Sequence, residues 1–183
     1  YAAGWSAAVL DSLARANNLG DVMQDRTIRA YQPFFEKKYG EKHALSLSFK
    51  DFKIALPQAF SNGQTAFDFL SGLTDRVSGI EDFGQLPIPF LCIGTDVSDG
   101  SQVVFERGNL ARALRGSGAL PGVLAPVEVD GRLIADGGIV NNFPAREVRE
   151  KGVDIVIGVT VEAGLYDKDQ LQSIEKIIEQ VGS

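Results

Sequence analysis

Apolar residues recur every three to four positions in several stretches of this 183-residue chain, and this spacing predicts helices. In the first stretch Val9, Leu10 and Leu13 share a face, Ser6 is a suitable N-cap, and an Asn-Asn-Leu-Gly run supplies a stop. Near the other end, Gly152 can terminate a short helix. The predicted helices cover residues 6–17, 65–75, 144–151 and 167–180, with a further short helix around Ala111.

Strands are predicted where apolar residues run together between turn signals. The run LPIPFLCIGTDV, bracketed by Pro89 and Asp96, suits a fully buried strand of a parallel or mixed sheet. Asp99-Gly100 and Asp130-Gly131 are hairpin signals, and a returning strand follows each. The segment DIVIGVTV predicts one more strand over residues 154–161. Alternation of strands with helices is typical of an α/β layer fold, and we expect a single domain.

Composition narrows the class of protein. A hydrophobic content of 44% and a charged content of 23% are ordinary for a globular domain with a sizeable core. The formal net charge of -6 argues against nonspecific nucleic-acid binding, which basic patches drive. No apolar run approaches the ~20 residues of a membrane-spanning helix. No metal-ligand spacing or dinucleotide fingerprint is found, so we expect no metal and no cofactor.

Two residue types with reactive side chains occur once each. Cys92 lies in the apolar run PFLCIG, which predicts a buried structural thiol. His43 lies in the charged stretch KKYGEKH, which favours a solvated surface residue over a base for Ser-His-Asp chemistry.

The stretch ADGGIVNNFPA, residues 135–145, combines the signals of a tight strand-to-helix loop. Gly137 and Gly138 permit close backbone approach, and Pro144 suits the first turn of a helix. Asp136 follows a short predicted strand, so its carboxylate lies at the strand's carboxyl end, where open α/β sheets place ligands. Most Asp-Gly pairs, however, only accept backbone hydrogen bonds in a turn. The local pattern leaves both interpretations open.

Several segments, taken in order, resemble the second half of patatin-like phospholipase domains. They are the Thr95-Asp96 strand end, the ALRGSGALPG loop, the PVEVDGR hairpin, the DGG motif and NNFP, and the similarity covers at least residues 83–161. The resemblance implies a three-layer α/β/α sandwich with a mainly parallel sheet. The segments SNGQTAFDFL and YAAGWS are similar to a bacterial branch in which a patatin domain precedes an outer-membrane β-barrel.

The resemblance implies a lipid acyl hydrolase, of phospholipase A or esterase type, that works with a serine–aspartate dyad and without a histidine. The implied site residues are Asp136 as the dyad aspartate, Gly137, Gly138, Asn141 and Asn142 as its supporting loop, and Ser117 and Pro121 as candidate lining residues. For Ser117, in a Gly/Pro loop, a structural role is favoured. Arg112 and Arg115 are candidates for contact with an anionic head group but are more often ordinary helix-surface charges.

No residue of the chain qualifies as the nucleophile. The segment Gly4-Trp5-Ser6-Ala7-Ala8 has alanine where a G-x-S-x-G elbow needs its second glycine, and no apolar strand precedes it. In the family, a segment like YAAGWS lies on the helix that leaves the elbow, so we expect the serine shortly before Tyr1. Residues 1–183 are then a partial domain, inactive alone, without the first strand, the oxyanion loop and the elbow.

The expected substrate is an ester in a lipid, met at a membrane surface, and a partner chain or a preceding segment would complete the domain. A bacterial cell envelope, outer membrane or secreted location is favoured over the cytoplasm. The alternative is a noncatalytic binding or assembly module with a degenerate patatin fold. Sequence upstream of Tyr1 distinguishes the two hypotheses.

Overall fold

The computed structural model describes residues 1–23, 25, 48–50, 53–55 and 59–160. Its centre is a four-stranded sheet in the order β5-β4-β8-β7. The strands of this sheet are β4 (Cys92–Asp96), β5 (Gln102–Phe105), β7 (Val127–Val129) and β8 (Arg132–Asp136). Two short pairs lie outside it: β1 (Ser48–Lys50) with β2 (Lys53–Ala55), and β3 (Ala59–Ser61) with β6 (Gly122–Leu124).

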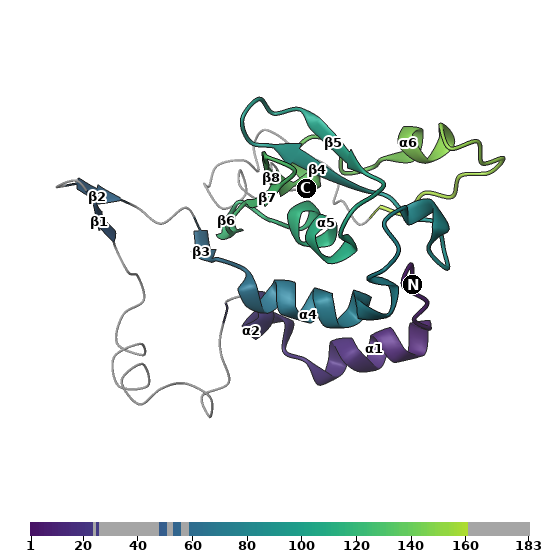
Figure 1. Cartoon of the computed structure of the whole chain (residues 1–183), viewed down its shortest axis with the longest axis horizontal. Helices are drawn as coiled ribbons and strands as arrows, with labels where there is room; N and C mark the ends of the chain where they lie inside the picture. Colours follow the sequence, from purple (N-terminus) through teal and green to yellow (C-terminus); the bar gives the residue numbers. More distant parts are fainter. Residues whose placement is uncertain (24, 26–47, 51–52, 56–58, 161–183) are drawn as a thin grey trace, which may run out of the picture.

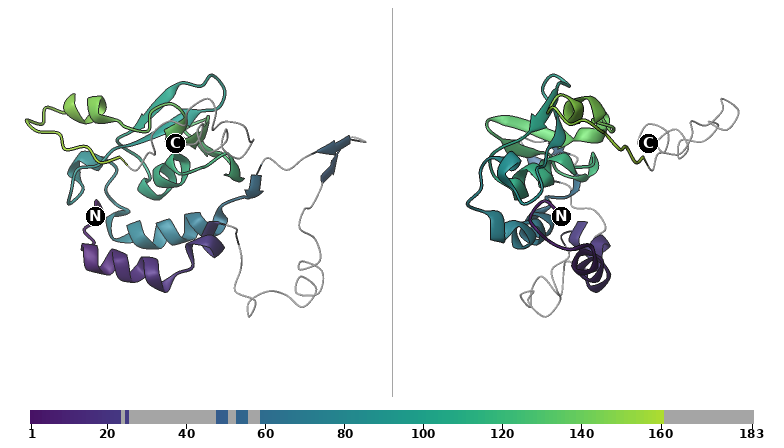
Figure 2. Two further views of the ribbon diagram at one scale, coloured as in Figure 1. Left: turned by 180° about the vertical axis from the view of Figure 1, so that it is seen from behind. Right: turned by 90° about the vertical axis from the view of Figure 1, so that its right-hand side faces the viewer.

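Helices are stacked on one side of the central sheet (Figure 1). α5 (Leu110–Ser117) contacts β4, β7 and β8, α4 (Gln64–Thr74) packs on α5, and α2 (Leu19–Met23) contacts α4. α1 (Ala7–Ala16) runs alongside α4 in the front and back views (Figure 1, Figure 2), and α6 (Ala145–Arg149) lies beyond β5. Single 3-10 turns are η3 (Asp75–Val77), η4 (Phe83–Gln85) and η5 (Gly137–Ile139). Among the described residues, no helix combines the length and apolarity needed to cross a bilayer.

The core lies between the sheet and α5. Phe83 and Ile134 are fully buried, and Cys92 and Leu110 belong to the same cluster. Every residue of β4 is buried, as the apolar run around Cys92 predicts. Burial of apolar surface on this scale is the main stabilising contribution to a domain of this size.

Caps and turns follow the predicted local chemistry. Ser6 is the N-cap of α1, and its hydroxyl accepts a hydrogen bond from the backbone N–H of Val9. Asp130 and Gly131 have φ values of 50° and 76°, which form the tight β7–β8 turn expected of an Asp-Gly pair. The helices predicted around residues 65–75 and 144–151 correspond to α4 and α6.

The strand predicted over residues 154–161 is wrong for the described part, because residues 154–160 form no strand. Ile155, Ile157 and Val159 are 78%, 87% and 83% exposed. A strand needs a hydrogen-bonding neighbour along at least one edge, and no described segment pairs with this one. The predicted helix at 167–180 and His43 lie outside the described residues.

The central sheet differs in direction from the mainly parallel sheet that the resemblance implies. Its pairs β4–β5, β4–β8 and β7–β8 are all antiparallel. For β4–β5 and β7–β8 the reason is the length of the connection, since a short hairpin can join only antiparallel strands. Within the described ranges, parallel pairing is confined to β3 with β6.

Arg115 is 2% exposed, so its interpretation as a helix-surface charge is wrong, whereas Arg112 is exposed. The Arg115 guanidinium donates to the backbone carbonyls of Asn62, Gly63 and Ala125. Burial lowers the pKa of Arg115, and the nearby carboxylate of Asp25 opposes this effect. Arg115 therefore joins the connection before α4 to the connection after β6.

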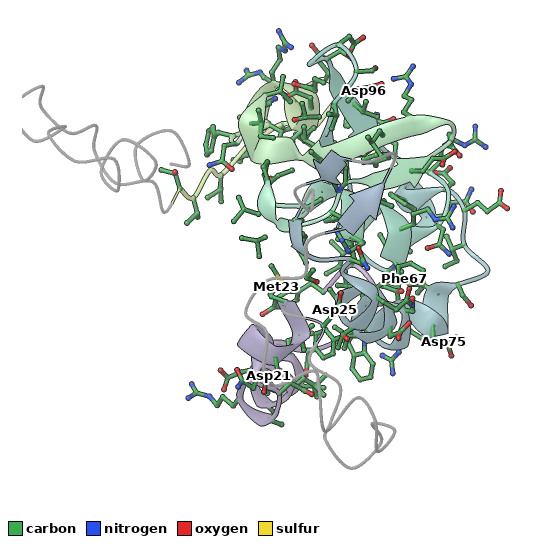
Figure 3. All side chains as sticks on the ribbon, turned by 90° about the vertical axis from the view of Figure 1, so that its left-hand side faces the viewer. Asp21, Met23, Asp25, Phe67, Asp75 and Asp96 are labelled. Atoms are coloured by element: carbon green, nitrogen blue, oxygen red, sulfur yellow. The ribbon has the colours of Figure 1, made fainter. Side chains whose placement is uncertain are left out.

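Asp25 lies between α2 and the start of α4 (Figure 3). Its carboxylate accepts hydrogen bonds from the Ser61 hydroxyl at 2.7 Å and from the N–H groups of Gly63 and Thr65 at 2.7 and 2.8 Å. Burial raises the pKa of Asp25, but these hydrogen bonds together lower it below its usual value. Asp25 and Arg115 thus form a charge-balanced cluster at the start of α4.

Replacing Arg115 with methionine is expected to lower the free energy of unfolding by about 3 kcal/mol. Methionine fills a similar volume but removes three hydrogen bonds to backbone carbonyls and leaves Asp25 without its countercharge. Urea denaturation followed by circular dichroism measures the change. The exposed Arg112→Met on the same helix is the control, with an expected change below about 0.5 kcal/mol. Equal stabilities of the two variants would contradict the structural role of Arg115.

Candidate active site

Asp136 is the last residue of β8 and begins the loop that enters η5. Its backbone is held on both sides, because its N–H donates to the Ala119 carbonyl at 3.1 Å and its carbonyl accepts from the Thr95 hydroxyl at 2.7 Å. Carboxylate oxygen Oδ1 accepts from the Gly138 N–H at 2.8 Å. The side chain is half-buried, and Oδ2 has no hydrogen-bond partner among the described residues. Hydrogen bonds therefore fix the backbone and one carboxylate oxygen of Asp136, and the other oxygen is available to an external group.

The two glycines after Asp136 are required to different degrees. A Cβ on Gly137 would collide with the backbone carbonyl of Ile93 in β4, so this position excludes every other residue type unless the strand moves. A Cβ on Gly138 would lie 3.1 Å from the Asn142 side chain and 3.2 Å from Asp136 Oδ1, a tight but milder contact. The missing side chain of Gly137 thus allows the loop to contact β4, and that of Gly138 leaves room beside the Asp136 carboxylate.

Gly94 is a further glycine of the site, and it lies opposite Asp136 in the β4–β8 register. A Cβ on Gly94 would come within 2.6 Å of the Ile134 side chain and 2.7 Å of the Phe105 ring. The signal for this role is present in the sequence, since a glycine inside a continuous apolar strand often marks a close approach of neighbouring groups.

Asn141 connects the loop to its surroundings through both ends of its amide. Its oxygen accepts from the Phe143 N–H at 3.2 Å, and its nitrogen donates to the side-chain oxygen of Gln102 at 3.0 Å. The Gln102 nitrogen donates in turn to Glu147 Oε1 at 2.8 Å. Asn142 is exposed beside Gly138. No local pattern singles out Gln102 or Glu147, because glutamate on a short helix is ordinarily solvated.

Ser117 lies at the end of α5 and not in the predicted Gly/Pro loop. Burial raises the pKa of the Cys92 thiol to about 12, although the nearby Ser117 hydroxyl acts to lower it. Cys92 is thus a buried thiol, as predicted, and Ser117 lies close to it. Pro121 is exposed just before β6, in the connection whose Ala119 bonds Asp136.

The described residues form apolar cavities. One of about 490 Å³ is lined by Phe90, Pro144, Val148 and Val153, among others, and includes the ion-paired Lys151. Another, of about 330 Å³, lies between α1 and α4. Asp136 lines neither cavity. The half-buried carboxylate of Asp136 is therefore not the floor of either cavity.

Comparison with known proteins adds the family. Residues 3–149 match the family model described as patatin-like phospholipase. An uncharacterized NTE family protein of Mycobacterium tuberculosis is 48% identical over 83 residues, which are 44% of this chain and 23% of that protein. Lysophospholipase NTE1 of Candida albicans is 29% identical over 97 residues, or 53% of this chain and 7% of the relative. Lysophospholipase NTE1 of Saccharomyces cerevisiae is 37% identical over 82 residues, which are 45% of this chain and 5% of that protein.

The matched stretch spans less than a quarter of the length of these relatives. The family model, in contrast, covers most of this chain and includes the loop that carries Asp136. A patatin domain is an α/β/α sandwich, so the predicted α/β class is confirmed. The chain belongs to the patatin-like phospholipase family.

Proposed function

We propose that the protein is a lipid acyl hydrolase that uses a serine–aspartate dyad, with Asp136 as the aspartate. The observation that carries this proposal is the carboxylate geometry, in which Oδ1 is bonded to Gly138 and Oδ2 has no partner among the described residues. Similarity to patatin-like phospholipases and to lysophospholipases supports a lipid ester as the substrate.

In this reaction the serine oxygen attacks the ester carbonyl carbon while the hydroxyl proton passes to Asp136. Collapse of the tetrahedral intermediate breaks the bond to the alcohol, which leaves with that proton, and an acyl-enzyme remains. Water then attacks the acyl-enzyme and gives a proton to Asp136. This proton returns to the serine oxygen as the fatty acid is released. The fixed Oδ1 orients the carboxylate, and Oδ2 is the oxygen that takes the proton.

The serine is proposed to lie on a G-x-S-x-G elbow that precedes Tyr1. Two serines within the chain already have structural positions, since Ser6 caps α1 and Ser117 ends α5 beside the buried Cys92 thiol. The exposed apolar residues around Ile157 support the same proposal. Their composition is that of a strand buried inside a sheet, and a strand from a preceding segment would cover them.

A fluorophosphonate ester, which forms a covalent adduct with activated serines, tests the proposal on the purified native protein. Peptide mass spectrometry is expected to locate the adduct on a serine within G-x-S-x-G before Tyr1, and heat-denatured protein should carry none. An adduct on Ser6 or Ser117 would contradict the proposed dyad. A native start near Tyr1 together with no adduct would favour the noncatalytic module.

A further inference from the structure

Thr95 and Gln102 are directly opposite each other in the β4–β5 pair, so their side chains lie on one face of the sheet. Each bonds one end of the Asp136 loop. The Thr95 hydroxyl donates to the carbonyl of Asp136 at 2.7 Å, and the Gln102 side-chain oxygen accepts from Asn141 at 3.0 Å. The Asn141 N–H also donates to the Gly137 carbonyl at 2.9 Å. One cross-strand pair therefore holds both ends of the loop.

Gln102 can do this only in one orientation of its amide. A half-turn about the last side-chain bond exchanges the oxygen acceptor and the NH₂ donor. The Gln102 nitrogen donates to Glu147 Oε1 at 2.8 Å, and a carboxylate can only accept. Glu147 therefore selects the orientation that turns the Gln102 oxygen towards Asn141.

Glu147 is 6% exposed, although it is charged. Arg146 approaches Oε1 at 3.4 Å, while Oε2 is buried without a hydrogen-bond partner among the described residues. The hydrogen bond from Gln102 is the main cause that holds the pKa of Glu147 below its usual value. One oxygen of this carboxylate is bonded to Gln102 and the other lacks a hydrogen bond within the described part of the chain, so the contacts of Glu147 are concentrated on the Gln102 amide.

We propose that Glu147 and Gln102 are positioning residues for Asp136. Glu147 orients the Gln102 amide, Gln102 holds Asn141, and Asn141 holds the loop that carries the aspartate. The effect on hydrolysis rests on the proposed function, whereas the effect on the loop does not.

Glu147→Leu and Glu147→Gln in the full-length protein test this proposal. Leucine removes the acceptor, so the backbone N–H groups of residues 138–141 are expected to exchange with solvent about tenfold faster. With the aspartate displaced, kcat for ester hydrolysis should fall at least about tenfold at unchanged KM. The Tm should change little, because leucine removes the unbonded carboxylate oxygen together with the hydrogen bond from Gln102. Glutamine keeps an oxygen acceptor and should stay within about twofold of the parent protein in both measurements.

Glu150→Leu, at an exposed position just after the same helix, is the matched control and should leave loop exchange unchanged. Unchanged exchange at residues 138–141 in Glu147→Leu would overturn the proposal. A lower Tm with faster exchange throughout the sheet would also overturn it, because the role would then be purely structural. If Glu147→Leu does not fold, Gln102→Met removes the same link, and the same change in loop exchange is required. A parent protein that hydrolyses no ester would refute the proposed function, while loop exchange still decides the positioning role.

Discussion

Replacing Asp136 with asparagine is expected to reduce kcat for lipid ester hydrolysis by roughly 10³–10⁴-fold in the full-length protein. Asparagine can still accept the hydrogen bond from Gly138 through its side-chain oxygen, so the loop keeps its shape. An amide, however, cannot take the serine proton at the position of Oδ2. Turnover of a short-chain activated ester and of phospholipid vesicles measures the loss, and circular dichroism verifies the fold.

Asp130→Asn is the matched control for this variant. Asp130 has φ 50° in the β7–β8 turn, and asparagine adopts this conformation readily. The same change of charge and size at the opposite end of β8 should leave turnover within about twofold, because Asp130 has no place in the proposed chemistry. Near-normal turnover by Asp136→Asn would show that the aspartate only shapes the turn.

Gly137→Ala is expected to lower the free energy of unfolding by about 3 kcal/mol. The added methyl group would meet the backbone carbonyl of Ile93, and β4 is bonded to β5 and β8 on its two edges, so it cannot move away cheaply. Urea denaturation followed by the fluorescence of Trp5, the only tryptophan of the chain, measures the change.

Alanine substitutions at two other glycines are the controls for the stability change in Gly137→Ala. Gly138→Ala meets side-chain atoms at 3.1 Å or more, and should cost at most about 1 kcal/mol. Gly79→Ala meets nothing within 4 Å and should be neutral or slightly stabilising. If Gly137→Ala were as stable as Gly79→Ala, the close contact between the loop and β4 would not exist in solution.

The features that could be predicted from sequence are those decided by a few neighbouring residues. The Ser6 cap, the Asp130-Gly131 turn and the tight loop at Asp136 each depend on side chains and backbone angles within four positions. The family resemblance depends on such segments in a fixed order, and the match over residues 3–149 confirms it. The catalytic role of Asp136 stays a prediction.

The features that escaped prediction depend on partners far away along the chain. Arg115 is buried because backbone carbonyls around Gly63, some fifty residues earlier, accept its hydrogen bonds. Glu147 is buried because it faces Gln102 across the gap between α6 and β5. The segment around Ile157 has the composition of a strand, but pairing is a property of two segments, and one segment's pattern cannot supply the other.

Cys92 has a practical consequence for labelling the Asp136 loop. It is the only cysteine of the chain, and with a pKa of about 12 its thiol reacts slowly with electrophiles near neutral pH. A cysteine introduced at the exposed Val140 would therefore outcompete it for a thiol-directed dye. A fluorophore on the loop could then report lipid binding beside Asp136, with the native thiol left in the core.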